Sequence, residues 1–293
     1  MRNNMKTLVL MAGLGALFVA VGQLLGGTNG AVMALVIAGL LNFAMYFFST
    51  KIALASARAK PVTESELPNV YSIVRSLTQR ENMPMPQIYV IESPQPNAFA
   101  TGRNPSHAAV AVTRGIVQMM DNTELEGVLA HEISHVRNRD ILISSIAATV
   151  AAALSFLVRI SFWTGGSGSR DRNNPLAGIV GLLSIILAPL AAMVIQMAIS
   201  RSREYEADHS GAEITGSPLA LARALAKLED GTSKIPMEVS PSTAQLFIAD
   251  PLKAFGRSGR SGGSGLSRMF STHPPISDRI ARLEDMAQGG IIR

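Results

Sequence analysis

Four long apolar runs interrupt an otherwise polar chain. They extend over residues 5–25, 31–48, 141–163 and 177–199. Each is long enough for a helix to cross the hydrocarbon core of a bilayer, which takes about 20 residues. Only the uncharged linker "GGTNG" separates the first two runs, which predicts a hairpin of two membrane spans in preference to a cleaved signal peptide. The last two runs predict a second hairpin, with a buried or re-entrant hairpin as the alternative.

Basic residues flank the four runs on one side. They are Arg2, Lys6, Lys51, Arg58, Lys60, Arg137, Arg139, Arg201 and Arg203. By the positive-inside rule, this distribution predicts that both termini and the polar segments face the cytoplasm. Two features oppose it: the linker of the second hairpin carries Arg170 and Arg172, and Arg159 lies inside the third run, near enough to its end to reach the membrane interface.

The polar segments alternate between helix and strand patterns. Helical periodicity predicts helices over residues 62–82, 121–140, 200–216 and 217–231, and a short helix after the two prolines of the segment 272–290. Residues 86–93 and 107–115 are rich in β-branched residues and predict strands, with 96–102 as an extended stretch or edge strand. Thr63 with Glu66 and Thr123 with Glu126 have the spacing of a capping box, which predicts the start of a helix. Ser217 is the predicted cap of another helix, and Gly231 its predicted end.

These patterns predict an α+β integral membrane protein that is mainly helical, with four transmembrane helices and a small β-sheet. The predicted parts are a transmembrane hairpin (1–50), a first cytoplasmic part (51–140), a second hairpin (141–200) and a second cytoplasmic part (201–293). Of the 293 residues, 47% are hydrophobic and only 16% are charged, against about a quarter in soluble domains. The net charge of +5 comes mostly from the basic flanks, and no basic helix with interleaved aromatic residues indicates nucleic-acid binding.

Cysteine is absent, so any zinc or iron site must be built from His, Asp and Glu. The strongest such signal is the pattern "HEISH". On a helix, His131 and His135 share one face, about one 5.4 Å turn apart, and both can bind one Zn²⁺ at about 2.0–2.1 Å. Glu132 can hold the metal's water and take its proton. Two surface histidines are the alternative, but the neighbouring Leu129 and Ile133 are not typical of an exposed face.

A catalytic zinc site needs a third protein ligand and one open position. The segment "SREYEADHSG" offers Glu204, Glu206, Asp208 and His209 on one predicted helix. Glu204 and Asp208 share a face, so a ligand Glu204 would leave Asp208 one turn further along, where it can accept the other ring N–H of a ligand histidine. Spacing alone does not choose between Glu204 and Glu206. A solvated acidic helix, paired with the arginines at its start, is the alternative.

The two motifs together resemble the HtpX-type membrane zinc metalloproteases, which share one family with the prenyl-protein (CAAX) endoproteases and the Oma-type proteases. The resemblance also covers the N-terminal hairpin, "PNAFATG" and the late "HPP…RI", so it spans nearly the whole chain. It implies a gluzincin-like fold with one zinc ion bound by His131, His135 and Glu204, and Glu132 as general base. It also implies a cytoplasmic site that degrades damaged or misfolded membrane proteins.

The resemblance further places His273 and Arg279 near the site, where a donor would stabilise the oxyanion by about 3–4 kcal/mol. Asn97 and its neighbours are candidates for binding a peptide by β-augmentation, with an ordinary strand edge as the alternative. His107 and His209 are expected to be surface or structural histidines. Residues 256–268 are rich in glycine and serine and predict a mobile loop, which could gate the cleft because it precedes His273.

We therefore predict a zinc endopeptidase of the cell (inner) membrane, multi-pass, with protein substrates, the lipid bilayer and other membrane quality-control proteases as partners. A helix that begins in water and continues into lipid would hold the zinc close to the bilayer, where substrates leave the membrane. One alternative is a zinc-stabilised scaffold or chaperone, in which Glu132 is dispensable. Another is a small transporter that uses Arg159 and Asn42 as polar sites within the membrane.

Overall fold

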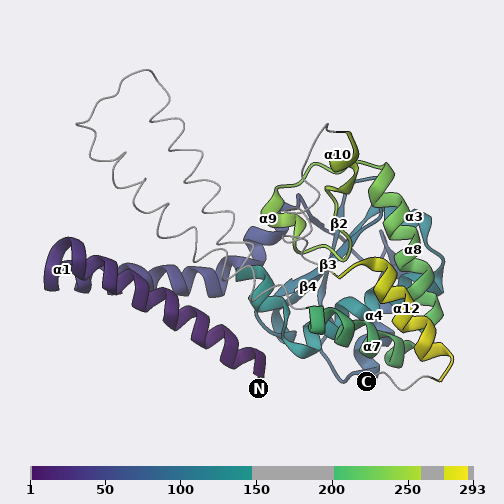
Figure 1. The fold of residues 1–293 in the computed structure, drawn as a ribbon. Coiled ribbons are helices and arrows are strands. Elements are labelled where there is room, and N and C mark those ends of the chain that lie inside the picture. Colours follow the sequence, from purple (N-terminus) through teal and green to yellow (C-terminus); the bar gives the residue numbers. More distant parts are fainter. Residues whose placement is uncertain (1, 147–200, 259–273, 290–293) are drawn as a thin grey trace.

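A computed structural model describes residues 2–146, 201–258 and 274–289 of the chain (Figure 1). Its strands are β1 (Lys60–Pro61), β2 (Gln87–Ile91), β3 (Ala98–Gly102) and β4 (Ala108–Thr113). Its helices are α1 (Arg2–Ser56), α2 (Pro68–Arg80), the short 3₁₀ turn η1 (Pro105–His107), α3 (Arg114–Met119), α4 (Asn122–Asn138), α7 (Arg201–Thr215), α8 (Pro218–Lys234), α9 (Pro241–Ala244), α10 (Lys253–Ser258) and α12 (Ile276–Ala287).

The N-terminal apolar segment, α1, consists of two helices that fold back on each other (Figure 1). The chain reverses at Gly27, whose φ of 59° and ψ of −147° lie in a region that essentially only glycine adopts. Next to the turn the backbones of the two helices are in contact, since a Cβ on Gly22 would lie 2.4 Å from the carbonyl oxygen of Gly30. The side-chain amide of Asn42 donates to the carbonyl of Met11 across the hairpin at 3.1 Å. The predicted N-terminal hairpin is thus present as a helix pair.

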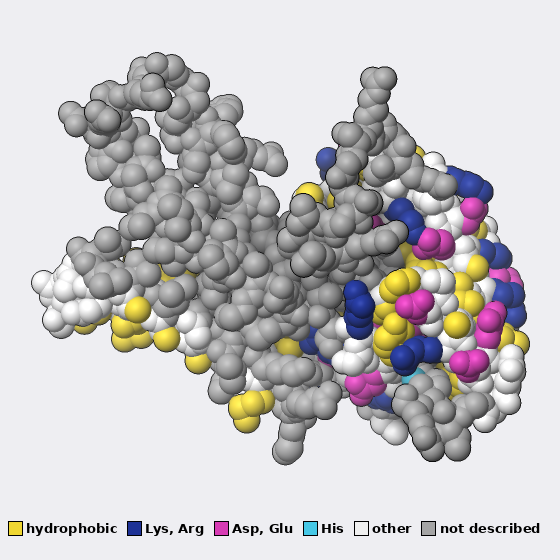
Figure 2. Space-filling view, in the orientation of Figure 1, with side chains coloured by type: hydrophobic (Ala, Val, Ile, Leu, Met, Phe, Trp, Pro, Cys, Tyr) yellow, Lys and Arg dark blue, Asp and Glu magenta, His cyan; other side chains and the backbone are white. Residues whose placement is uncertain are grey.

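Within the described ranges, one helix is long and apolar enough to cross a membrane by length and composition, Gly26–Ser56. Figure 2 shows hydrophobic side chains along the described part of this arm, whereas charged side chains gather over the described polar domain at the right of the view. Of the predicted second hairpin, residues 141–146 are described, and Ile141, Ile143 and Ile146 are buried there. The remainder of that hairpin, with Arg159, lies outside the described residues.

A four-stranded mixed sheet forms the centre of the polar domain, in the order β1-β2-β4-β3. β2 and β4 are parallel, while β1 and β3 are antiparallel to their neighbours. β3 lies at one edge of the sheet, in agreement with the predicted extended stretch or edge strand. Both faces are buried, because Val110 and Val112 of β4 pack against α2, α4 and α8, and Ala109 and Ala111 face the end of α1 and residues 237–247. The apolar run "AAVAVT" is typical of a strand covered on both faces.

The polar segments before and after the second apolar hairpin share one core. Leu129 and Ile133 of α4 belong to the same buried cluster as Leu221 and Leu225 of α8. Helix α7 packs along α4, and α12 packs on both α7 and α8 (Figure 1). The division of the chain into four parts stays a prediction, but residues from both polar parts build a single protein core.

The start of α2 differs from the prediction. Glu66 accepts hydrogen bonds from the backbone N–H and the hydroxyl of Thr63, at 2.7 and 2.8 Å, yet the helix begins only at Pro68. Proline is favoured in the first turn of a helix, and it disfavours helical geometry in the preceding residue. The Thr63–Glu66 pair therefore closes a turn ahead of the helix.

The capping box of α4 lies two residues earlier than predicted. Asp121, not Thr123, caps the helix: its side chain accepts from the N–H of Glu124 at 2.9 Å. The Glu124 carboxylate accepts from the N–H of Asp121 at 3.1 Å, which completes the reciprocal pair in place of Glu126. Aspartate and threonine are both good capping residues, so the sequence alone allowed either register.

Helix α8 begins at Pro218 as predicted, although Ser217 makes no side-chain capping bond, and it continues past Gly231 to Lys234. A Cβ on Gly231 would lie 2.3 Å from Cγ of Pro96, so this glycine makes room for a neighbouring segment rather than ending the helix. The predicted 256–268 loop is likewise shorter at its start, because its first three residues belong to α10. Its other residues lie outside the described ranges.

Candidate metal site

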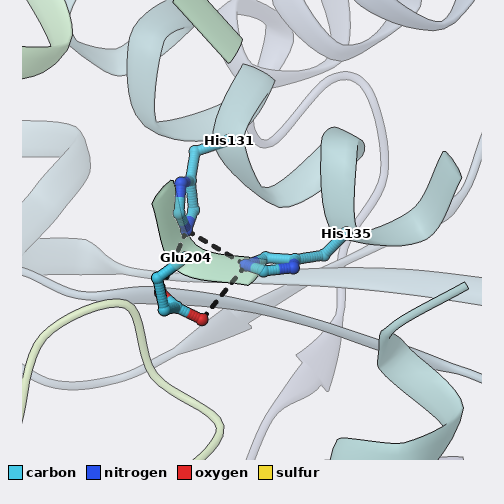
Figure 3. Close-up of side chains that lie close together, drawn as sticks. All are labelled: His131, His135 and Glu204. Carbon is cyan, nitrogen blue, oxygen red and sulfur yellow. Dashed lines mark hydrogen bonds and ion pairs between the residues drawn. The ribbon is translucent and has the colours of Figure 1, made fainter. Parts of the chain in front are cut away.

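Three predicted ligands meet where α7 crosses α4. The rings of His131 and His135 stand edge to face, with Nε2 atoms 3.2 Å apart. Glu204, at the start of α7, places Oε2 3.7 Å from Nε2 of His131 and Oε1 3.5 Å from Nε2 of His135. Figure 3 shows the three side chains pointing toward one another. The close approach of the two helices needs Gly211, since a Cβ there would lie 2.9 Å from the backbone nitrogen of His131.

The spacing of these donor atoms fits one zinc ion. Ligands bound tetrahedrally at about 2.0–2.1 Å lie about 3.3 Å from one another. The three donor separations are 3.2, 3.5 and 3.7 Å, close to that value. Two imidazoles and one carboxylate are also a donor set typical of catalytic zinc, with the fourth position open to water. His131, His135 and Glu204 form a group within the described residues that can hold a metal ion.

Glu132 lies on the same turn of α4 and is almost fully buried. The backbone N–H of Ala100 in β3 donates to its Oε2 at 2.7 Å, which ties this carboxylate to the edge strand. Burial raises the pKa of Glu132 above its ordinary value, although the neighbouring His131 and His135 oppose the shift. Glu132 is therefore a buried carboxylate with an increased tendency to hold a proton.

Asp208 contacts His131 at the ring nitrogen that faces away from the other two donors. Its Oδ1 lies 2.9 Å from Nδ1 of His131, one helical turn beyond Glu204, as predicted from the spacing. Arg279 binds this carboxylate through two hydrogen bonds, Nη2 to Oδ1 at 2.6 Å and Nε to Oδ2 at 2.8 Å. Burial would raise the pKa of Asp208, but the charge and hydrogen bonds of Arg279 outweigh it and lower the pKa to about 2.

His135 has a corresponding carboxylate, Asp140, which the sequence did not reveal. Oδ2 of Asp140 lies 3.2 Å from Nδ1 of His135. Burial favours the neutral ring, but the hydrogen bond to Asp140 and the charges of Glu204 and Glu132 prevail and raise the pKa of His135 to about 9. Asp140 could not be predicted from the sequence because it follows the end of the helix, where helical spacing no longer indicates which side chains are close together.

A cavity of about 40 Å³ adjoins the three donors. Its polar lining includes Glu132, Ser144 and Gln245, and Leu246 and Ile248 are among its apolar lining residues. A volume of this size holds water rather than a peptide. The residues that line the cavity are therefore close to a water molecule bound at the open metal position.

Asn97, the predicted peptide-binding residue, is fully buried. Its amide nitrogen donates to the carbonyl of Ala249 at 2.8 Å, and its amide oxygen accepts from the N–H of Ala249 at 3.3 Å. Next to it, the N–H of Ile248 donates to the carbonyl of Ala98 at 3.0 Å. Residues 248–249 thus cover the Asn97 end of β3, and peptide binding by Asn97 stays a prediction.

Of the remaining candidates, Arg279 lies close to the donors, with Nη1 3.9 Å from Oε2 of Glu204, and the others lie away from them or outside the described residues. Glu206 is exposed, which agrees with the choice of Glu204 as the donor. His107 contacts Asn104 on the surface, and His209 pairs with Glu213 in its own helix at 3.3 Å. His273 falls in the undescribed range 259–273. Arg279 is fully buried, and besides Asp208 it donates to the carbonyl of Ile248 at 3.2 Å.

Comparison with known proteins agrees with this geometry. Residues 64–287 match the model of peptidase family M48. The chain is 52% identical to a protease HtpX homolog of Thermodesulfovibrio yellowstonii, over 98% of this chain and 99% of that protein. It is 47% identical to a protease HtpX homolog of Pelotomaculum thermopropionicum, over 97% and 99% of the two chains.

The fold is similar to that of S. mikatae Ste24p in its crystal structure, with a TM-score of 0.52 and 21% identity. That alignment covers 96% of this chain and 65% of Ste24p, so the chain spans less than two thirds of the length of that protein. At this identity the likeness shows the fold alone. The family match and the two relatives go further, and the chain therefore belongs to peptidase family M48, a family of metalloproteases, and resembles its HtpX members over nearly its whole length.

Proposed function

We propose that the chain is an integral-membrane zinc endopeptidase that holds one zinc ion and cleaves misfolded or damaged membrane proteins at the cytoplasmic face of the cell (inner) membrane. The observation that carries this proposal is the convergence of His131, His135 and Glu204 at separations that suit tetrahedral zinc. The likeness to HtpX proteases supports the substrate class and the membrane.

Proton transfer is assigned to Glu132. A zinc ion bound at this site would supply a water of lowered pKa and a positive charge beside the scissile carbonyl. Glu132 lines the cavity beside the three donors, and its bond from Ala100 holds the carboxylate there. It takes the proton of the attacking water and delivers it to the leaving amine.

The buried residues around the ligands orient them. Asp208 accepts from Nδ1–H of His131, which leaves Nε2 as the metal-binding nitrogen. The guanidinium of Arg279 binds Asp208 and the Ile248 carbonyl, and its Nη1 lies 3.9 Å from Oε2 of Glu204, so we assign it to the support of His131 and Glu204 rather than to the oxyanion. The oxyanion donor proposed from the resemblance is then His273.

The junction between α1 and the polar domain supports a site close to the bilayer. Ala53, Leu54 and Ala57, at and just past the end of α1, belong to one buried cluster with Phe99 of β3 and Phe247. Only a few residues separate Ser56 from β1, so the sheet follows directly on the apolar helix. The basic flanks of the apolar runs favour the cytoplasmic side for this domain.

Glu132→Gln distinguishes the peptidase from a zinc-stabilised scaffold. In purified full-length protein, it should retain zinc at one ion per chain and lose cleavage of casein by at least about 100-fold, since a single general base contributes 10²–10⁴-fold. Glu126→Gln, on the same helix but paired with Arg80 near the surface, is the matched control and should cleave normally. Unchanged cleavage by Glu132→Gln would remove the proposed mechanism, and a wild-type protein without zinc would remove the proposed function.

The transporter alternative gains no support from Asn42. Its amide is hydrogen-bonded to the Met11 carbonyl inside the α1 hairpin, so it joins the two helices. The other residue of that hypothesis, Arg159, lies outside the described residues. The zinc donors and Glu132 remain the group around which a function can be argued.

A further inference from the structure

The two candidate zinc-binding histidines are held in the same way but by different parts of the chain. Each turns Nε2 toward the other donors and Nδ1 toward a buried aspartate: Asp208 for His131 and Asp140 for His135. Each aspartate also faces a buried arginine. Arg279 binds Asp208, and Nε of Arg203 lies 4.0 Å from Oδ1 of Asp140.

The end of α4 brings Asp140 back to His135. Arg139 adopts the left-handed conformation, with φ of 60° and ψ of 32°, and reverses the chain directly after the helix. The N–H of Asp140 then donates to the carbonyl of His135 at 3.0 Å, which is the 6→1 hydrogen bond of a Schellman motif. This bond places the Asp140 side chain beside the ring of the same residue whose carbonyl it caps. The carboxylate is therefore positioned by local backbone geometry.

Arg203 extends this contact to the third donor. It directly precedes Glu204 on the first turn of α7, and its side chain is buried against Asp140. The Asp140–Arg203 pair thus joins the last turn of α4, which carries His135, to the first turn of α7, which carries Glu204.

We propose that Asp140 and Arg203 are positioning residues of the metal site: Asp140 fixes the tautomer and ring plane of His135, and Arg203 fixes the distance between His135 and Glu204. The inference rests on the proposed function, because it concerns the zinc ligands. The side chain of His135 is 14% exposed, whereas that of His131 is 1% exposed. Because packing holds His135 less tightly, the orientation of its ring depends more on the hydrogen bond to Asp140. With Nδ1–H donated to Asp140, Nε2 carries the lone pair that faces Glu204 and His131.

The test is the zinc affinity of the full-length protein, measured by competition with a chromophoric chelator. Asp140→Asn should bind zinc about 10- to 100-fold more weakly than wild type, and Asp140→Ala should be weaker still. Asp140→Glu should recover part of the loss. Asp230→Asn, which alters an exposed aspartate paired with Lys234, is the control and should bind like wild type.

Arg203→Met should weaken zinc binding in the same direction, while Arg201→Met, two residues earlier and exposed, should not. The absorption spectrum of the cobalt-substituted protein separates positioning from folding. Its ligand-field bands should shift in Asp140→Asn and in Arg203→Met even where the unfolding midpoint of the metal-free variant matches wild type.

Wild-type zinc affinity and an unchanged cobalt spectrum in Asp140→Asn would overturn the inference and leave the proposed function standing. If the wild-type protein bound no zinc, both would fall. Should Asp140→Ala not fold, the Asn and Glu variants at position 140 still decide the question.

Discussion

The two histidines of the candidate metal site differ in what holds them. The support of His131 comes from two helices distant in sequence, with Asp208 on α7 and Arg279 on α12. The support of His135 begins within five residues, because the cap of its own helix supplies Asp140. The first arrangement couples the site to the packing of the domain, whereas the second depends mainly on the conformation of one helix end.

This contrast predicts that damage to the His131 side costs global stability. Arg279→Met would leave the Asp208 carboxylate buried without its ion-pair partner, and it should lower the free energy of unfolding by about 3–5 kcal/mol. Urea unfolding of the metal-free protein measures the effect. Arg282→Met, three residues along the same helix and stacked on the exposed side of Tyr205, should cost far less. Equal losses in the two variants would show that the buried pair does not couple α12 to the site.

The two sides should also respond oppositely to pH in the metal-free protein. The pKa of Asp208 is lowered to about 2, so its contribution to stability is complete above the unfolded value near 3.9 and is lost as the pH falls toward 2. The pKa of His135 is raised to about 9, so its contribution is complete below about 6.5 and is lost as the pH rises to 9.

Urea midpoints between pH 3 and 10 test this contrast. His135→Gln should flatten the decline between pH 6.5 and 9, and Asp208→Asn should flatten part of the acid decline. Zinc should abolish the alkaline decline, because a bound His135 is already deprotonated. An alkaline decline that persists in His135→Gln would assign it to another group.

The smallest expected effect concerns the helix end itself. Arg139 is exposed and has a positive φ, a conformation that costs a non-glycine residue about 1–2 kcal/mol. Arg139→Gly should therefore be more stable than Arg139→Ala by about 1 kcal/mol, since both remove the charge and only glycine relieves the strain. Zinc affinity should be the same in both, because the cap is kept. Equal stability of the two variants would mean that the left-handed turn carries no strain.

The sequence determined the parts of this protein that depend on short-range periodicity. The spacing of His131 and His135 placed both on one helix face, and that of Glu204 and Asp208 did the same on a second helix. The apolar runs around Gly27 produced the first helix hairpin, and the β-branched runs produced the strands. Each of these follows from contacts within a few residues, which a linear pattern records.

Only the tertiary structure decided which of these faces meet. It brought Glu204 rather than the exposed Glu206 to the histidines, tied Glu132 to Ala100, and buried Asn97 against Ala249. It also set the start of α2 at Pro68 and the cap of α4 at Asp121, and paired Arg279 with Asp208. Spacing along a chain fixes direction only while one helix or strand continues. Beyond its end, the position of a side chain depends on the backbone turn that follows and on how the elements pack. Asp140 lies just past such an end, where the left-handed turn at Arg139 returns it to His135.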